Sequence, residues 1–215
     1  MNIGLLGGSF DPVHNGHLTA AREVLKKFPL DLILLIPAAQ APLKDAPVRA
    51  SAADRLALLH AATDGIPGLA ICDYELQRGG TSYTIDTLRH LHALHPPPGN
   101  RLYWIIGADQ LPQLPRWRDP AGLACLADFI CIHRPGHPLP PPPPIPGLRL
   151  HTLMNTTPVD ISSTELRARL ARGESLDERW LPHNAIEYLR KTGLYRPACP
   201  NSPPAKPTRI TPSNS

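Results

Sequence analysis

Two histidines near the amino terminus, His14 and His17, stand three residues apart with Gly16 between them. Imidazole groups donate hydrogen bonds to phosphate oxygens, more strongly when they are protonated beside an anion. The pair follows an apolar stretch, Ile3–Leu6, and two consecutive glycines that let a ligand approach the backbone. A helix expected over Gly16–Phe28 would point its free N–H groups and positive dipole end at the same place. These features predict a phosphate site, and Gly16 would let a nucleotide pack against the helix start.

The two familiar phosphate loops do not match this segment. A Walker A loop needs a lysine and a hydroxyl residue after its last glycine, and none follows Gly16 in that way. A dinucleotide fingerprint needs GxGxxG, and Gly4, Gly7 and Gly8 have the wrong spacing. The remaining pattern is HxGH. The alternative without a ligand is that both histidines only cap and solvate the helix.

A second candidate anion site lies far along the chain, in VDISSTELR. Ser162 and Glu165 have the spacing of a capping box, which predicts a helix start. The hydroxyls of Ser163 and Thr164 and the guanidinium of Arg167, one turn on, would complete an anion pocket. A capping box alone explains Ser162 and Glu165 but not Arg167. Two such helix starts suit a polyphosphate.

Three further segments carry candidate binding residues. Asp109 follows the expected strand Leu102–Ile106, and Trp117 lies eight residues later; the plainer alternatives are a helix cap and a core residue. Tyr83 and Thr84 open an expected helix in GGTSYTIDTL, where an ordinary N-cap by Ser82 or Thr84 is the alternative. Lys44, in the loop after DLILLI, is either a phosphate ligand or a solvated lysine.

Apolar runs alternate with helix-like segments along the chain. This alternation predicts βαβ units and therefore an α/β fold with a Rossmann-like, doubly wound parallel sheet in which ligands bind beyond the carboxyl ends of the strands. We expect a single domain over residues 1–196, with a small C-terminal helical part. The expected strands are Ile3–Leu6, Asp31–Ile36, Leu69–Cys72, Leu102–Ile106, Asp128–His133 and Leu148–Thr152. The expected helices are Gly16–Phe28, Ala50–Thr63, Thr84–His95, Ser162–Arg172 and His183–Thr192, the last ending at Gly193.

Composition narrows the class of protein. The chain has 215 residues, 42% hydrophobic and 19% charged, which is typical of a globular domain. Its 28 prolines cluster, so we expect an exposed polyproline connector over Arg134–Gly147 and a disordered tail over residues 197–215. The net charge is +4, and Lys206 and Arg209 of the tail supply half of it. The nearly balanced body argues against a nucleic-acid partner.

The cysteines and the apolar runs bear on location. No CxxC pair occurs, so neither a zinc site nor a disulfide framework is expected, and Cys72, Cys125 and Cys131 are interpreted as core residues. No apolar run is long enough for a membrane span, and the first residues lack the features of a signal peptide. We therefore expect a cytoplasmic protein with no membrane partner; a homo-oligomer stays open.

The segment GGSFDPVHNGHL resembles the signature of the HxGH nucleotidylyltransferase superfamily and is similar, more closely, to that of bacterial nicotinate-nucleotide adenylyltransferases. The downstream segments match the same family. The resemblance implies that ATP, carried with Mg²⁺, contacts the first loop and the second helix start, and that His14, His17 and Arg167 are catalytic. The implied ATP ligands are Gly8, Ser9, Phe10, His14, Gly16, His17, Ile161, Ser162, Ser163, Thr164 and Arg167.

The same resemblance implies a nicotinate mononucleotide site. It would present Thr84 N–H groups to the carboxylate, stack Trp117 on the pyridine ring, and use Tyr83, Asp109 and Lys44 as further contacts. The loop before Lys44 lacks the histidine that many relatives carry. The implied reaction transfers AMP to the mononucleotide. Alternatives are transfer to nicotinamide mononucleotide or to phosphopantetheine, a class I aminoacyl-tRNA synthetase, for which no KMSKS-type loop is found, and a non-catalytic nucleotide-binding module.

Overall fold

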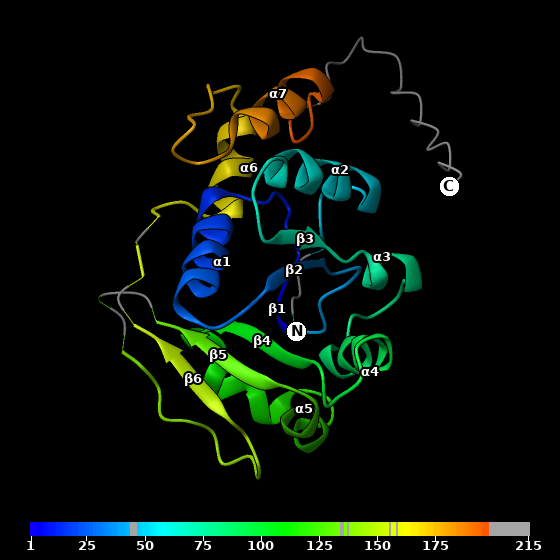
Figure 1. The fold of residues 1–215 in the computed structure, drawn as a ribbon. Helices are drawn as coiled ribbons and strands as arrows, with labels where there is room; N and C mark the ends of the chain where they lie inside the picture. The colour runs from blue at the N-terminus through cyan, green and yellow to red at the C-terminus, as the bar shows by residue number, and fades with distance from the viewer. Residues whose placement is uncertain (44–46, 134–135, 137, 155, 158, 198–215) are drawn as a thin grey trace.

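Six parallel strands form one sheet in the order β3-β2-β1-β4-β5-β6 (Figure 1). The structure is a computed structural model that describes residues 1–43, 47–133, 136, 138–154, 156–157 and 159–197. The chain order reverses between β1 and β4, which is the switch point where doubly wound sheets bind ligands. The expected fold class is confirmed. The strands are β1 (Asn2–Gly8), β2 (Leu32–Pro37), β3 (Leu69–Ile71), β4 (Arg101–Gly107), β5 (Asp128–Ile132) and β6 (Leu150–Leu153).

All five expected helices are present, and three short elements were missed. The missed elements have five, nine and seven residues, too few for a helical period to stand out, and the second is a 3₁₀ helix with two internal prolines. The long helices are α1 (Asn15–Lys27), α2 (Ala52–Thr63), α4 (Thr84–Leu94), α6 (Ser163–Ala171) and α7 (His183–Thr192). The missed elements are α3 (Tyr74–Arg78), the 3₁₀ helix η1 (Ala108–Arg116) and α5 (Pro120–Leu126).

Side chains that alternate along each strand divide the core into two layers. In β4, Tyr103 and Ile105 pack with α1, α2, α6 and α7, whereas Trp104 and Ile106 pack with α4, η1 and α5. Figure 1 shows α1, α2 and the two last helices above the sheet and α4 and α5 below it. Burial on both faces explains why the strands are continuous apolar runs.

The small C-terminal helical part packs onto the upper layer. Leu166, Leu170, Ile186 and Leu189 are buried in the same cluster as the apolar faces of α1 and α2. As expected, α7 stops at Gly193, which takes a left-handed conformation with φ 66°. This packing places α6 and α7 beside the carboxyl end of β1, so residues from both ends of the chain meet there.

Some expectations need correction. Cys131 is buried, Cys72 is half-buried, and Cys125 is exposed on α5, so the interpretation of Cys125 as a core residue is wrong. In the proline connector, residues 138–147 form neither helix nor strand. The expectations for Arg134 and for the tail from residue 198 lie outside the described residues.

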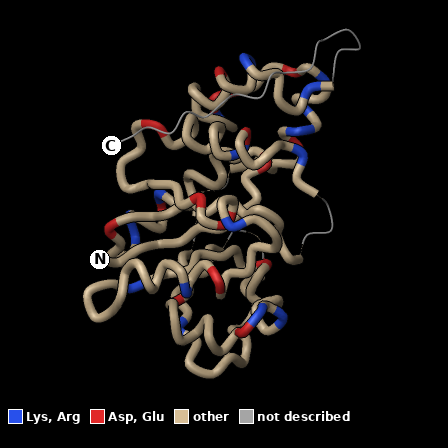
Figure 2. Tube along the Cα trace, turned by 90° about the vertical axis from the view of Figure 1, so that its right-hand side faces the viewer, with Lys and Arg blue, Asp and Glu red and all other residues tan. Residues whose placement is uncertain are grey.

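Charge and hydropathy along the described chain are unremarkable. Figure 2 shows basic and acidic positions interspersed along the trace, without a stripe of one sign. Within the described ranges, no helix is long and apolar enough to cross a membrane.

Candidate active site

A cavity of about 920 Å³ opens at the carboxyl ends of β1 and β4. Segments far apart in sequence line it: the loop after β1, the start of α1, the ends of β4 and β5, part of the loop after β2, and the segment that leads into α6. Its size is at the upper end of the range for small-molecule sites. The lining includes Gly8, Ser9, Phe10, Asp11, His14, Gly16, His17, Asp109, Thr156, Thr157, Ile161, Ser163, Thr164 and Arg167.

The two histidines cap α1 reciprocally. His14 is the N-cap, its imidazole accepts from the His17 backbone N–H, and the His17 Nδ1 accepts from the His14 backbone N–H at 3.2 Å. The rings lie 3.8 Å apart between centroids. When one nitrogen of a neutral imidazole accepts, the other carries the proton. Each ring can therefore donate one N–H to an anion, and capping and anion binding are compatible.

Gly16 is required by the His14 ring. A Cβ on Gly16 would lie 2.9 Å from His14 Nδ1 and 3.0 Å from His14 Cε1. The sequence predicts that this glycine allows the close approach of a nucleotide. The structure shows that a side chain at this position would first meet the His14 ring. Phe10 completes the arrangement, because its ring meets His17 edge-on with centroids 5.1 Å apart. Its backbone is left-handed, with φ 44°, which an L residue rarely adopts.

The start of α6 faces the start of α1. Ser162 caps α6 by accepting from the Glu165 N–H at 3.1 Å, but the Glu165 carboxylate pairs with Arg169 at 2.7 Å. Only half of the expected capping box is therefore formed. Ser163 Oγ donates to the Pro12 carbonyl at 2.8 Å, which joins the two helix starts directly.

Arg167 projects from α6 into the same cavity. Its Nη1 donates to the Asp11 carbonyl at 2.5 Å, and its Nη2 donates to Thr164 Oγ1 at 3.1 Å. The side chain is 24% exposed, so part of the guanidinium faces the open space. Arg167 and the imidazoles thus bring positive or donor groups to the cavity from two sides.

A buried arginine that sequence reasoning missed supports these loops from behind. Arg55 of α2 is only 1% exposed, and its Nη1 donates to the carbonyls of Ser9 at 2.6 Å and Ala38 at 2.8 Å. These carbonyls belong to the loops after β1 and β2. Burial lowers the pKa of Arg55, and the nearby Asp11 opposes that shift. The available signal was its spacing, because Arg55 shares an i, i+3, i+4, i+7 stripe with Leu58, Leu59 and Ala62.

The start of α4 forms a second group of candidate residues along the same sheet edge. The N-cap is Tyr83 rather than Ser82 or Thr84, so the alternative of an ordinary cap by either of those residues is wrong. Ser82 Oγ instead accepts from the Ala39 N–H at 2.9 Å, which ties this segment to the loop after β2. Tyr83 and Trp117 both pack against the lower core layer and are absent from the lining of the main cavity. Lys44 lies outside the described residues.

A buried carboxylate fixes this segment from below. Glu75 of α3 is 4% exposed and accepts from Thr87 Oγ1 at 2.6 Å. Burial raises the pKa of Glu75, while hydrogen bonds from Thr87 and Ser82 act against the shift. Glu75 therefore explains two residues of the SYTIDTL segment, Ser82 and Thr87, as supports for the helix start.

Basic side chains surround that helix start. Asp86 lies within 4.0 Å of Arg78, Arg89 and Arg118, and Arg89 also pairs with Asp119 at 2.8 Å. The Arg118 guanidinium lies 4.8 Å from the centre of the Tyr83 ring. Three guanidinium groups therefore lie near the start of α4, together with the carboxyl groups of Asp86, Asp119 and Glu75, the last of which interacts with Arg78.

Comparisons with known proteins agree on the family. A cytidylyltransferase-like family model matches residues 5–169. A probable nicotinate-nucleotide adenylyltransferase from Opitutus terrae is 52% identical over 198 residues, covering 92% of this chain and 100% of that protein. The chain belongs to the nicotinate-nucleotide adenylyltransferase family. A second probable member, from Bordetella avium, is 42% identical over 91% of this chain and 98% of its own length.

Solved structures support the fold of this adenylyltransferase family member. The Plasmodium falciparum nicotinic acid mononucleotide adenylyltransferase, complexed with APC, has a TM-score of 0.69 at 21% identity and covers 90% of this chain and 96% of that one. The same enzyme complexed with NaAD also gives 0.69, at 22% identity, covering 90% of this chain and 97% of that one. The family resemblance inferred from GGSFDPVHNGHL is therefore confirmed, while the roles of individual residues stay predictions.

Proposed function

We propose that this adenylyltransferase transfers AMP from ATP to nicotinate mononucleotide, which gives nicotinate adenine dinucleotide and pyrophosphate. One observation supports the residue assignment above all: the starts of α1 and α6, with His14, His17 and Arg167, line one cavity at the switch point of the sheet. Such a cavity offers two helix N-termini, imidazole donors and a fixed cation to a polyanion.

In this proposal the ATP phosphates lie between the two helix starts. The imidazoles approach from the α1 side, and Arg167, Ser163 and Thr164 approach from the α6 side. The loop over Gly8, Ser9 and Phe10 provides close backbone approach, and its Ser9 carbonyl is held by Arg55. Ile161 lines the wall of the cavity and Ser162 caps the helix behind it.

The reaction needs alignment more than acid–base chemistry. A 5′-phosphate oxygen of the acceptor attacks the α-phosphorus of ATP in line. The bond from that phosphorus to the bridging oxygen breaks, and pyrophosphate leaves with the electron pair. The nucleophile is already anionic at neutral pH. Catalysis therefore rests on holding the two anions in line and on stabilising charge on the bridging and equatorial oxygens.

The acceptor would bind at the start of α4. A carboxylate is stabilised by a helix N-terminus, as a phosphate is, and this favours an acid over a neutral amide. Trp117 would stack on the flat pyridine ring, and Tyr83 and Thr84 would contact the carboxylate. Asp109, which lines the main cavity, would contact a ribose or help place the reacting phosphates, between the two subsites.

The Mg²⁺ would enter the reaction with ATP, as part of the substrate. In the described part of the chain, no group of three or more His, Cys, Asp or Glu side chains is placed to hold a metal ion. Bound to ATP, Mg²⁺ would neutralise negative charge on the phosphates and so make pyrophosphate a better leaving group.

Pyrophosphate release with different acceptors tests the proposal. The enzyme would be given magnesium-ATP with nicotinate mononucleotide, nicotinamide mononucleotide or phosphopantetheine in turn, and a reaction without acceptor is the control. We expect the acid to be used with a kcat/KM at least about tenfold above the amide, which corresponds to about 1.4 kcal/mol. Faster use of either rival acceptor would contradict the assignment. Binding of ATP without pyrophosphate release from any acceptor would favour a non-catalytic module.

A further inference from the structure

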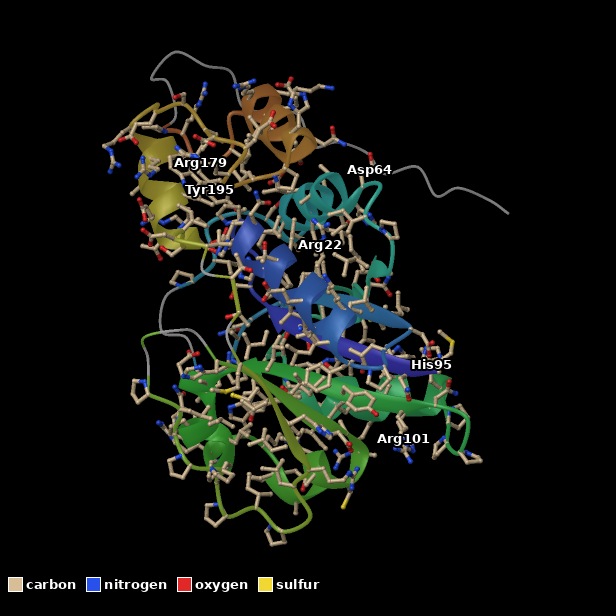
Figure 3. The ribbon with its side chains drawn as sticks, turned by 60° about the vertical axis from the view of Figure 1, so that its left-hand side comes forward. Arg22, Asp64, His95, Arg101, Arg179 and Tyr195 are labelled. Atoms are coloured by element: carbon tan, nitrogen blue, oxygen red, sulfur yellow. The ribbon has the colours of Figure 1, made fainter. Side chains whose placement is uncertain are left out.

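The C-terminal helical part holds the histidine loop at several points. The Asn15 backbone N–H donates to the Trp180 carbonyl at 2.7 Å, and Ser163 Oγ donates to the Pro12 carbonyl. A third contact comes from Tyr195, whose hydroxyl donates to Asp11 Oδ1 at 2.8 Å across 184 residues of sequence. Figure 3 shows Tyr195 in the upper part of the molecule, near α6.

Asp11 is a buried charge with an organised set of donors. Its side chain is 5% exposed. Oδ1 accepts from the Tyr195 hydroxyl and from the Ala50 N–H at 3.1 Å, and Oδ2 accepts from the Arg49 N–H at 2.8 Å. Arg167 Nη1 is 3.7 Å from Oδ2, beyond hydrogen-bond distance, while the same nitrogen donates to the Asp11 carbonyl. The carboxylate thus has three hydrogen bonds that do not use Arg167.

The backbone at the end of the described chain is shaped to make this contact. Gly193 ends α7 in a left-handed conformation, and Tyr195 itself has φ 68°, which non-glycine residues rarely adopt. Burial, followed by the bond to Asp11, raises the pKa of the Tyr195 phenol well above its usual range. The hydroxyl therefore keeps its proton at any working pH and acts as a permanent donor.

We infer that Tyr195 is a positioning residue for the ATP-phosphate site, acting through Asp11 on Arg167. The inference rests on the proposed function. With the hydroxyl in place, the Asp11 carboxylate is satisfied and leaves the side of Arg167 that faces the cavity available for phosphate. Without the hydroxyl, the buried Asp11 carboxylate has one donor fewer and attracts the Arg167 guanidinium, which lies only 3.7 Å away. Asp11 then competes with the ATP phosphates for Arg167.

Two tyrosine-to-phenylalanine variants test this inference. Tyr195→Phe removes the hydroxyl and keeps the ring. Tyr188→Phe is the matched control, because Tyr188 is in the same C-terminal part and its hydroxyl contacts Asp54, 3.4 Å away and outside the cavity lining. Calorimetric titration with magnesium-ATP in the absence of acceptor gives Kd, and steady-state assays give kcat and the KM of each substrate.

We expect Tyr195→Phe to raise Kd and KM for ATP about tenfold and to leave the KM for the acceptor unchanged, since one hydrogen bond to a charged group is lost. Tyr188→Phe should leave all of these constants unchanged. In an Arg167→Lys background, Tyr195→Phe should have a much smaller effect on ATP binding, because the residue through which it acts has already been altered.

The outcomes separate this inference from the function on which it rests. Equal loss of thermal stability in both variants with unchanged ATP binding would overturn the positioning role and leave the proposed function intact. Fully additive effects of Tyr195→Phe and Arg167→Lys would also overturn it, since they would show that Tyr195 acts by another route. A wild-type protein that binds no magnesium-ATP would overturn the proposed function and this inference together.

Discussion

Gly16→Ala is the substitution that most directly tests how the histidine loop works. The new Cβ would point at the His14 ring, which is itself 7% exposed and has little room to move. The backbone of Gly16 is helical, so alanine is compatible with the chain conformation. Alanine also has a higher helix propensity than glycine, by about 1 kcal/mol. The substitution should therefore stabilise the helix locally while it displaces the His14 imidazole.

The size of the displacement follows from the contact distances. Ordinary contact begins at 3.4 Å and the added Cβ would lie 2.9 Å from His14 Nδ1, so the ring must give way by 3.4 − 2.9 = 0.5 Å. Misplacing a catalytic contact by about 1 Å can cost about 100-fold in rate, so half of that predicts a loss of roughly tenfold in kcat/KM for ATP. A tenfold loss corresponds to about 1.4 kcal/mol of transition-state stabilisation.

The assay is pyrophosphate release at saturating nicotinate mononucleotide, with the unfolding midpoint measured on the same samples. Gly99→Ala is the control, because a Cβ there would meet nothing within 4 Å. We expect Gly16→Ala to lose activity with an unfolding midpoint close to that of the wild type, and Gly99→Ala to change neither. A folded Gly16→Ala enzyme with wild-type kcat/KM would refute the conclusion that the glycine exists to seat the His14 ring.

Two further predictions concern His17 in the histidine loop and Glu75 below the start of α4. His17→Ala removes a phosphate donor and half of the reciprocal cap, so kcat should fall by about 10²–10³ while circular dichroism stays that of a folded protein; a folded and fully active variant would contradict it. Burial raises the pKa of Glu75, so the Glu75 carboxyl group binds its proton more tightly in the folded protein than in the unfolded chain. The free energy of unfolding therefore falls as the pH rises above the ordinary carboxyl pKa of about 4.3. Because glutamine cannot ionise, the unfolding midpoint of Glu75→Gln, relative to that of the wild type, should rise between about pH 4 and about pH 7. A difference between the two midpoints that stays constant or falls over this range would rule out a raised pKa for Glu75.

The sheet could be predicted from sequence because burial on both faces leaves a strong signal. Runs such as LYWII and DLILLI have no other stable place in a domain of this size, and parallel strands in βαβ units restrict their order. The shorter elements carry no such signal. The helix over Pro120–Leu126 has only about two turns, and its Cys125 is exposed to solvent although its neighbours are apolar.

The candidate site was predicted unevenly. Side chains that would meet a ligand were found, because histidines and an arginine at helix starts have few structural uses. The supports were missed, because Arg55, Glu75 and Tyr195 lie 46, 7 and 184 residues from the groups that they hold, Ser9, Ser82 and Asp11. Contacts at such separations depend on the three-dimensional arrangement, and a single sequence contains no pattern that pairs them.

The hydrogen bonds of Arg55 and Asp11 explain why this fold keeps charged side chains in its interior. Arg55 and Asp11 are almost fully buried, and removing two charges from water generally costs as much as their attraction returns, so their presence is poorly explained by stability. Their hydrogen bonds point elsewhere: Arg55 fixes the carbonyls of two loops, and Asp11 collects the N–H groups of Arg49 and Ala50. These bonds fix the loops after β1 and β2, and the loop after β1 leads directly to the histidines. The imidazoles and Arg167 that line the cavity therefore stand on a backbone that buried charges hold in place.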